Sequence, residues 1–298
     1  MKNKILTLFL STFIIQLNAS DVHSITEISF EQSEISFDFD IQTYYGKRKI
    51  TDAGDVRNTI GKIESSYYFD GRTIIGPLDQ FKFFEPSSYI FLSHSYIRKD
   101  FSNLASDLIQ YYGPQYWNDR EYNLSSIRGR YYHGNYFAGA GLDYSSFDDS
   151  TLGEAELGFM LFDNFELGVV GTEYIESDYD FSAAFRYEHS IDEGSYIGLS
   201  ALISENSDIS YLAFKYFLRI LESYYLSNEI FLTEDSWKLK SSFYSNQRLS
   251  MSLGFSNDNN LSMIGASYFI TDNFSLTIQH SSDFEDYYVS KAGISAQF

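Results

Sequence analysis

The chain has 298 residues, with 26 tyrosines, 27 phenylalanines, three prolines and no cysteine. The lack of cysteine excludes disulfide bonds and thiolate metal sites, and the abundance of aromatic residues argues against a disordered chain. A net charge of −20 argues against nucleic-acid binding, which requires a basic surface.

Residues 1–19 have the pattern of a secretory signal peptide. Lys2 and Lys4 precede an apolar stretch, Ile5–Leu17, and Ala19 is a small residue suited to the cleavage site, although Leu17 is larger than usual for its position. The stretch is shorter than the ~20 residues of a spanning helix. An ordinary buried helix is the alternative. We expect export, cleavage after Ala19, and a mature domain of residues 20–298 with a net charge of −22, because only two lysines and no acid are removed.

Apolar and polar residues alternate along most of the remaining chain, as in a β-strand with one apolar face. Clear examples are residues 35–42, 180–188 and 249–256. Clusters of Gly, Asn, Asp and Ser separate these segments, and such residues favour turns. We predict sixteen strands, at 33–45, 58–69, 87–98, 120–133, 135–147, 151–162, 165–176, 178–190, 194–204, 207–219, 223–233, 236–245, 248–256, 259–270, 274–283 and 286–298.

The length and number of these strands favour a membrane barrel. A tilted strand needs ~9–11 residues to cross a bilayer, whereas strands of soluble proteins typically have ~5–6. Single-chain bacterial barrels have an even number of strands. We therefore predict an all-β fold, a transmembrane antiparallel up-and-down β-barrel of about sixteen strands. Fourteen or eighteen strands, and a secreted soluble β protein, are the alternatives.

Two segments, residues 70–86 and 99–119, do not fit a simple meander of strands. Residues 46–57 and 99–119 are the longest expected connections on one side of the barrel, and long loops are often functional. Residues 70–86 lie on the other side, where turns should be short, and could contain further short strands. The last strand should pair with the first, around residues 35–45, to remove the sheet edge.

Along the predicted strands, the charged residues occupy the alternate positions that the apolar residues leave free, so they lie on the face opposite the apolar face. A Lys or Arg facing lipid at the membrane midplane costs roughly 2–4 kcal/mol, so this placement favours a water-filled interior. We predict that basic groups face acidic groups across a lumen; the alternative is the solvated face of an ordinary sheet. The predicted pore-lining residues are Arg128, Arg130, Arg186, Lys238, Lys240, Asp38, Asp40, Glu156, Asp180 and Glu188.

Aromatic residues gather at the strand ends, as in the girdles that barrels place at both membrane interfaces. Packing between two sheets is the alternative. The predicted girdle residues are Tyr44, Tyr45, Tyr67, Tyr68, Phe69, Tyr131, Tyr132, Phe162, Phe165, Tyr224, Tyr225, Phe269 and Phe274.

No catalytic or metal-binding pattern stands out. The five histidines are scattered, and the chain has no HExxH, GxSxG or P-loop element. His280 and Ser281 are adjacent strand residues, which point to opposite faces. We therefore predict a protein that is not an enzyme and has no catalytic residues, metal or cofactor.

Several segments resemble a porin family of Gram-negative outer-membrane β-barrels. They are "SSYYFDGRTIIGPLDQFKFFEPSSYIFLSHSY", "LGFMLFDNFELGV", "ASYFITDNFSLTIQHSSD" and "YYVSKAGISAQF". The resemblance implies a passive channel in the bacterial outer membrane. Its expected partners are outer-membrane lipid, the barrel-assembly machinery, small hydrophilic solutes or ions, and further copies of the chain in a trimer. The last strand, with Ile294 and Phe298, resembles the assembly signal of such barrels.

These observations predict a porin that lets small hydrophilic solutes or ions diffuse through a water-filled barrel. The charge of −22 predicts some cation preference. The alternative is a non-conducting barrel with a structural or adhesive role, plugged by side chains or by residues 99–119.

Overall fold

The structure is a computed structural model, and it describes most of the chain after residue 20. The described residues are 21–43, 46–81, 83–102, 119–174, 179–192, 194–204, 209–285 and 287–298. Side chains are described for these residues except 21, 35–43, 46–53, 174, 179, 209 and 259. The predicted signal peptide, Tyr44, Tyr45 and most of segment 99–119 therefore lie outside the described residues.

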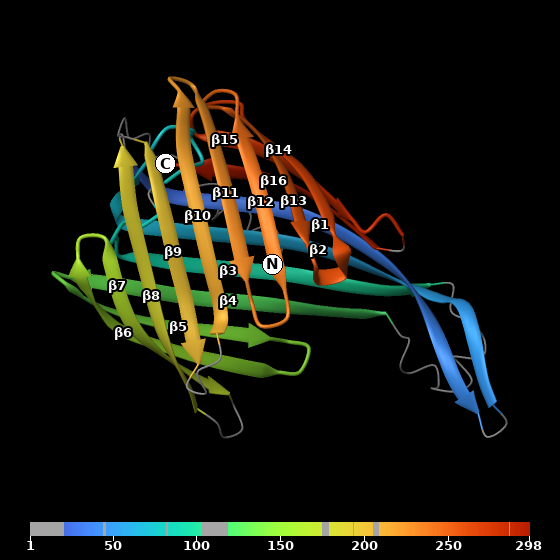
Figure 1. Cartoon of the computed structure of the whole chain (residues 1–298). Coiled ribbons are helices and arrows are strands. Elements are labelled where there is room, and N and C mark those ends of the chain that lie inside the picture. The colour runs from blue at the N-terminus through green and yellow to red at the C-terminus, as the bar shows by residue number, and fades with distance from the viewer. Residues whose placement is uncertain are drawn as a thin grey trace, which may run out of the picture.

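Nearly all described residues belong to β-strands (Figure 1). Among the described residues, no helix has the length and apolar character needed to cross a membrane. The strands are β1 (Asp21–Thr43), β2 (Gly46–Thr73), β3 (Tyr89–Ser102), β4 (Arg120–His133), β5 (Tyr136–Ser145), β6 (Ser150–Phe162), β7 (Phe165–Tyr174), β8 (Tyr179–Asp192), β9 (Ser195–Ser204), β10 (Ile209–Leu221), β11 (Tyr224–Leu232), β12 (Trp237–Tyr244), β13 (Leu249–Ser256), β14 (Ser262–Phe269), β15 (Phe274–Ser282) and β16 (Tyr287–Gln297), with a short 3-10 helix η2 (Asp258–Asn260).

The sixteen strands form a closed barrel in which each strand pairs antiparallel with its sequence neighbours, and β1 pairs with β16. The predicted fold class is confirmed, including the strand number. The predicted register of closure is wrong, because β16 pairs with residues 25–35 of β1 rather than with 35–45. The first strand begins twelve residues earlier than predicted, since Thr26, Gln32 and Glu34 interrupt its apolar parity.

The first two strands are much longer than the others and project beyond the barrel as a hairpin (blue in Figure 1). β1 pairs with β16 only as far as Ile35, and β2 pairs with β3 only as far as Asp55. Beyond these residues the two strands pair with each other. Residues 46–57, expected as a connection, are therefore the first part of β2.

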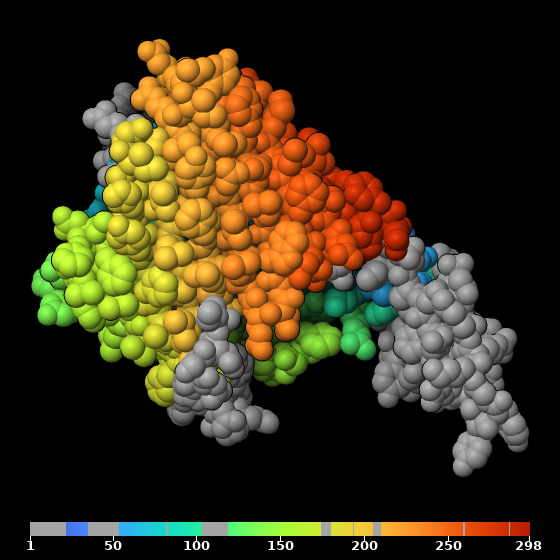
Figure 2. Space-filling model, viewed as in Figure 1, coloured from blue at the N-terminus to red at the C-terminus, as the bar shows by residue number. Residues whose placement is uncertain are grey.

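Alternation gives the barrel an apolar outside and a polar inside. Large apolar side chains such as Leu157, Ile264 and Ile278 are at least 60% exposed on the outer face. Figure 2 shows that side chains cover the wall continuously over the yellow and orange strands. Their neighbours along each strand, mainly Ser, Thr, Gly and charged residues, face inward. Because inter-strand bonds pair the backbone groups, such a wall is compatible with a lipid surrounding.

The predicted girdle is only partly correct. Tyr67, Tyr131 and Phe162 are exposed on the outer face near the barrel end where β1 begins and β16 ends, which we call the terminal end. Tyr225 and Phe269, predicted with them, are 4% and 3% exposed and face inward. The reason is parity, since adjacent strand residues point to opposite faces.

Candidate functional site

The connection between β2 and β3 turns into the barrel interior at the terminal end. We call residues 74–88 the strap. The prediction that 70–86 could contain extra strands is wrong: residues 70–73 complete β2, and the strap has one isolated bridge, between Ile74 and Phe81. Every other connection at this end has four residues or fewer. The strap is therefore the exceptional feature of the terminal end.

Local interactions close the base of the strap and shape its first turn. Glu85 accepts hydrogen bonds from the backbone N–H and the hydroxyl of Thr73, at 3.0 and 2.7 Å, and pairs with Arg72 at 3.8 Å. Gly76 has φ +118°, a region that side chains disfavour. A Cβ at Gly76 would lie 2.6 Å from the Tyr225 ring. Glycine is required here both by the backbone conformation and by the close approach to Tyr225.

The first half of the strap is bonded to the wall formed by the C-terminal strands. The backbone N–H of Leu78 donates to the carbonyl of Gln247 at 2.9 Å, and the carbonyl of Leu78 accepts from the Gln297 amide at 3.0 Å. The Gln80 amide donates to the Tyr244 hydroxyl at 2.7 Å. These bonds attach the strap to the wall around β12, β13 and β16.

The second half of the strap reaches β8 and β9. The backbone N–H of Phe84 donates to a carboxylate oxygen of Glu188 at 2.8 Å. The ring of Phe83 lies 6.2 Å from that of Tyr196 and over Gly198, where a Cβ would come within 2.4 Å of the ring. Starting and ending at β2 and β3, the strap thus extends across the interior to the opposite wall.

An inward cluster of aromatic residues forms the seat of the strap. Tyr196, Phe217, Tyr225 and Tyr244 come from the four neighbouring strands β9–β12, and Ile75 and Phe83 of the strap pack against them. Phe217 is fully buried and stacks on Tyr196 and Tyr225 at 5.6 Å. The sequence interpretation missed this cluster. The cluster could have been found in the sequence, because each of four successive strands has an aromatic residue at a position of its polar, inward face near the same barrel end.

One interior hollow lies between the strap and strands β11–β16 and β1, with a volume of about 290 Å³. We call it the serine hollow. Its charged lining consists of three carboxylates, those of Glu27, Asp79 and Glu229, and one lysine, Lys240. Most other lining side chains are small and polar: Ser242, Ser250, Ser252, Ser267, Ser275, Thr277 and Ser295.

A second interior hollow, of about 480 Å³, lies on the other side of the strap against β2–β4, β8 and β9. We call it the arginine hollow. Four arginines, Arg72, Arg128, Arg130 and Arg186, line it, and Glu85 is the one carboxylate in its lining. The strap therefore separates a hollow with an acidic lining from one with a basic lining.

Arg130 is the centre of a buried charge cluster. Its guanidinium contacts Glu156 at 2.6 Å and Glu166 at 2.9 Å, with side-chain exposures of 11%, 10% and 6%. Tyr132 donates a hydrogen bond to the other oxygen of Glu166 at 2.8 Å. Two carboxylates on one arginine compensate the buried charge, which would otherwise be unfavourable.

The other predicted pore-lining residues are found in several places. Arg128 pairs with Asp143 at 2.7 Å, and Glu188 binds the strap. By register, Lys238 and Asp180 lie inward toward the far end of the barrel. Asp38 and Asp40 belong to the projecting hairpin, and their side chains are outside the described ones. A role in lining a conducting pore stays a prediction for the whole set.

Asp79 is the titratable strap residue most affected by its surroundings. Burial raises the pKa of the Asp79 carboxyl above its ordinary value. A hydrogen bond from the Gln80 amide and the positive charges of Lys215 and Lys240 act in the opposite direction. Lys215 itself pairs with Glu229 at 2.8 Å.

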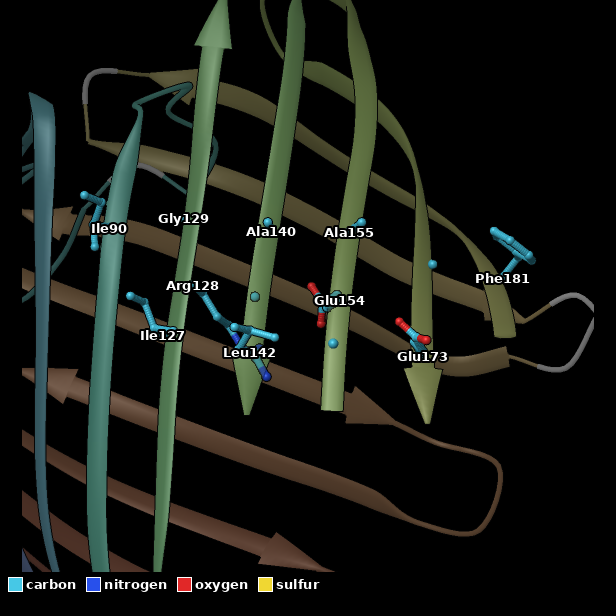
Figure 3. A pocket seen from close by; sticks show the side chains of 13 residues that line it. Ile90, Ile127, Arg128, Gly129, Ala140, Leu142, Glu154, Ala155, Glu173 and Phe181 are labelled. Carbon is cyan, nitrogen blue, oxygen red and sulfur yellow. The ribbon is translucent and has the colours of Figure 1, made fainter. Parts of the chain in front are cut away.

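A larger groove, of about 830 Å³, lies on the outer face of β3–β8 (Figure 3). Gly129, Ala140 and Ala155 form a row of small residues on neighbouring strands, and Ile127 and Leu142 lie beside it (Figure 3). These residues have the parity of the exposed apolar side chains. The groove is therefore part of the outer surface and not of the interior.

The C-terminus is built into the barrel seam. The backbone of Phe298 exchanges hydrogen bonds with that of Ser24, at 2.7 and 2.8 Å, and its ring packs edge-on against Phe274. Ile294 is 56% exposed on the outer face. The assignment of Ile294 and Phe298 as an assembly signal stays a prediction.

Solved barrels with a similar chain course are outer-membrane proteins. The crystal structure of outer membrane protein Omp33 of Acinetobacter baumannii has a TM-score of 0.48 and 14% identity, covering 94% of this chain and 100% of that one. A triple mutant of the Rhodopseudomonas blastica porin has a TM-score of 0.42 and 8% identity, covering 92% and 100%. No protein-family model and no curated protein matches the chain in sequence.

The described histidines and carboxylates are the side chains that a catalytic or metal-binding set would need. In the part of the chain that the structure describes, no three His, Asp or Glu residues form a group that could hold a metal ion. His280 and Ser281, adjacent in sequence, lie on opposite faces, and the His280 ring bonds Ser290 instead, at 2.9 Å. The described interior surfaces therefore consist of charged, hydrogen-bonding and aromatic side chains.

Proposed function

We propose that this protein is a porin of the bacterial outer membrane, through which small hydrophilic solutes or ions diffuse passively. The observation that carries the proposal is a closed barrel with an apolar outer face and polar hollows on both sides of an internal strap. Only helices and closed barrels satisfy their backbone groups in lipid.

The proposal includes an orientation. Outer-membrane barrels have short turns on the periplasmic side, so the terminal end, with its short turns, would face the periplasm. The strap would then narrow the periplasmic mouth. Outer-membrane lipid and the barrel-assembly machinery are the expected partners, and a homotrimer is the assembly to test by cross-linking.

We also propose a cation preference. The mature chain has an expected charge of −22, and three carboxylates and one lysine line the serine hollow. Rings of acidic side chains favour cations in pores. Cations would pass the strap along its serine side.

The experiment is conductance of the refolded mature protein in a planar bilayer. Discrete channels are expected, with a reversal potential of cation-selective sign in a KCl gradient. Heat-modifiable mobility on a gel verifies folding. If folded protein gives no discrete channels, the pore proposal fails; if channels are anion-selective, only the cation preference fails.

One observation favours a second candidate, a non-conducting structural barrel. The strap is bonded to both walls of the interior, and Phe217 beneath it is fully buried. This candidate requires a silent wild-type barrel and conductance only after the strap is replaced by a short Gly-Ser turn. Conductance by the wild type would reject it.

A further inference from the structure

The arginine hollow contains one guanidinium whose positive charge the protein does not use. Arg72 and Arg128 pair with Glu85 and Asp143, and Arg130 holds two carboxylates. The side chain of Arg186, the fourth arginine of the lining, has no carboxylate within 4.0 Å and makes no hydrogen bond with the described residues. It differs in this from the other three.

The carboxylates closest to Arg186 in the sheet are already occupied. Glu166 is its direct cross-strand partner on β7, but the two oxygens of Glu166 bind Arg130 and Tyr132. Glu188 lies two residues further along β8, and its oxygens accept from the Phe84 N–H and the Ser190 hydroxyl. Arg186 therefore directs unused donors toward the hollow. A guanidinium has five N–H groups in a planar fork, which matches a carboxylate in two parallel hydrogen bonds.

The rest of the lining suits a planar apolar group. Phe83, Tyr89 and Phe91 line the same hollow as Arg186, and so does the Ser200 hydroxyl. Aromatic rings bind other planar groups by stacking or edge contact. A volume of about 480 Å³ lies in the usual range for small-ligand sites of ~300–1,000 Å³. The hollow thus combines a guanidinium that has no carboxylate partner with aromatic walls.

We propose that the arginine hollow is a binding site for small carboxylates that carry a planar apolar body, with Arg186 holding the carboxylate. The inference rests on the proposed function, because the solute would reach the hollow through the lumen. It adds a solute class that a general cation preference does not predict. On the other side of the strap, the acidic serine hollow would repel the same solute.

The test uses benzoate as the probe and the refolded full mature chain in detergent. Titration calorimetry measures benzoate, with benzamide and benzylammonium as uncharged and positively charged analogues. Benzoate should bind best. Arg186→Gln should weaken benzoate binding about tenfold or more, because hydrogen bonds to charged groups are the stronger ones. Arg186→Lys, which keeps the charge but not the fork, should lie between.

Lys240→Gln is the matched control, since it removes an equal charge from the serine hollow. It should leave benzoate affinity within about twofold of wild type. An equal loss of benzoate affinity in Arg186→Gln and Lys240→Gln would overturn the proposal, because it would show that benzoate responds only to the net charge of the protein. Benzoate binding no tighter than benzamide would overturn it as well.

A bilayer measurement separates this inference from the pore proposal. Benzoate should reduce the KCl current of wild type and not that of Arg186→Gln. A conducting wild type without Arg186-dependent benzoate binding would refute the carboxylate site alone. Arg186-dependent binding to a silent barrel would refute the pore and support the site.

Discussion

Adding a methyl group at Gly198 of β9 should loosen the strap, although no residue of the strap itself is changed. A Cβ at Gly198 would lie 2.4, 2.5 and 2.7 Å from three ring atoms of Phe83. Ordinary contacts of this kind are 3.4–4 Å long, so in Gly198→Ala the Phe83 ring must move by about 1 Å. Gly61→Ala is the matched control, because a Cβ at Gly61 meets nothing within 4 Å.

The expected size of the effect follows from two terms. Overpacking a filled site typically costs ~1–3 kcal/mol, and the ring pair between Phe83 and Tyr196 is worth ~0.5–1.5 kcal/mol. The two terms are not additive, because a shift of the Phe83 ring relieves the overpacking while it weakens the ring pair, so we expect a net loss of ~1–2 kcal/mol in strap attachment, which raises the detached fraction about 5–30-fold. The barrel itself should remain closed, since the strand hydrogen bonds are unchanged.

The assay is thiol labelling of Ser87→Cys. Ser87 belongs to the strap, is 4% exposed, and the chain has no other cysteine. In the Gly198→Ala background, maleimide should react about 5–30 times faster than in the Gly61→Ala background. Equal rates in the two backgrounds would show that Phe83 does not hold the strap against β9, and would refute the reasoning.

Three further predictions concern other parts of the molecule. Because burial raises the pKa of Asp79, ionisation of this carboxyl destabilises the folded state. Asp79→Asn should therefore raise the thermal unfolding midpoint at neutral pH but not below pH about 4, where the carboxyl is protonated in the folded and the unfolded chain. A change in the midpoint that is the same at every pH would contradict this. Arg130→Met leaves the charges of Glu156 and Glu166 buried without a partner, so the free energy of unfolding measured with urea in detergent should fall by ~3–5 kcal/mol. Replacing both glutamates by Gln in the same variant should restore most of this free energy. Deletion of Phe298 should reduce the protein found in outer-membrane fractions far more than the conductance of assembled molecules; normal assembly in cells would disprove the signal.

The sequence predicted the barrel because strand alternation is a local property. Each residue's face follows from its parity, so the inward side of Arg130, Arg186 and Lys240 could be read without knowing their neighbours in space. The bounds of β4 agree with the predicted 120–133, and β5–β16 differ from prediction by three residues or fewer. The early start of β1 was missed because its apolar parity is interrupted by polar residues.

What only the tertiary structure decided is the course of the strap and the division of the interior. Gln80 and Tyr244 are bonded across 164 residues of sequence, and Phe84 and Glu188 across 104. No local pattern encodes such contacts, because they depend on which side chains barrel closure brings to the same height. Likewise, the position of Arg186 in the strand sequence places it inside, but only the structure shows that Glu166 bonds Arg130 and Tyr132, and that the Arg186 side chain has no carboxylate partner among the described residues.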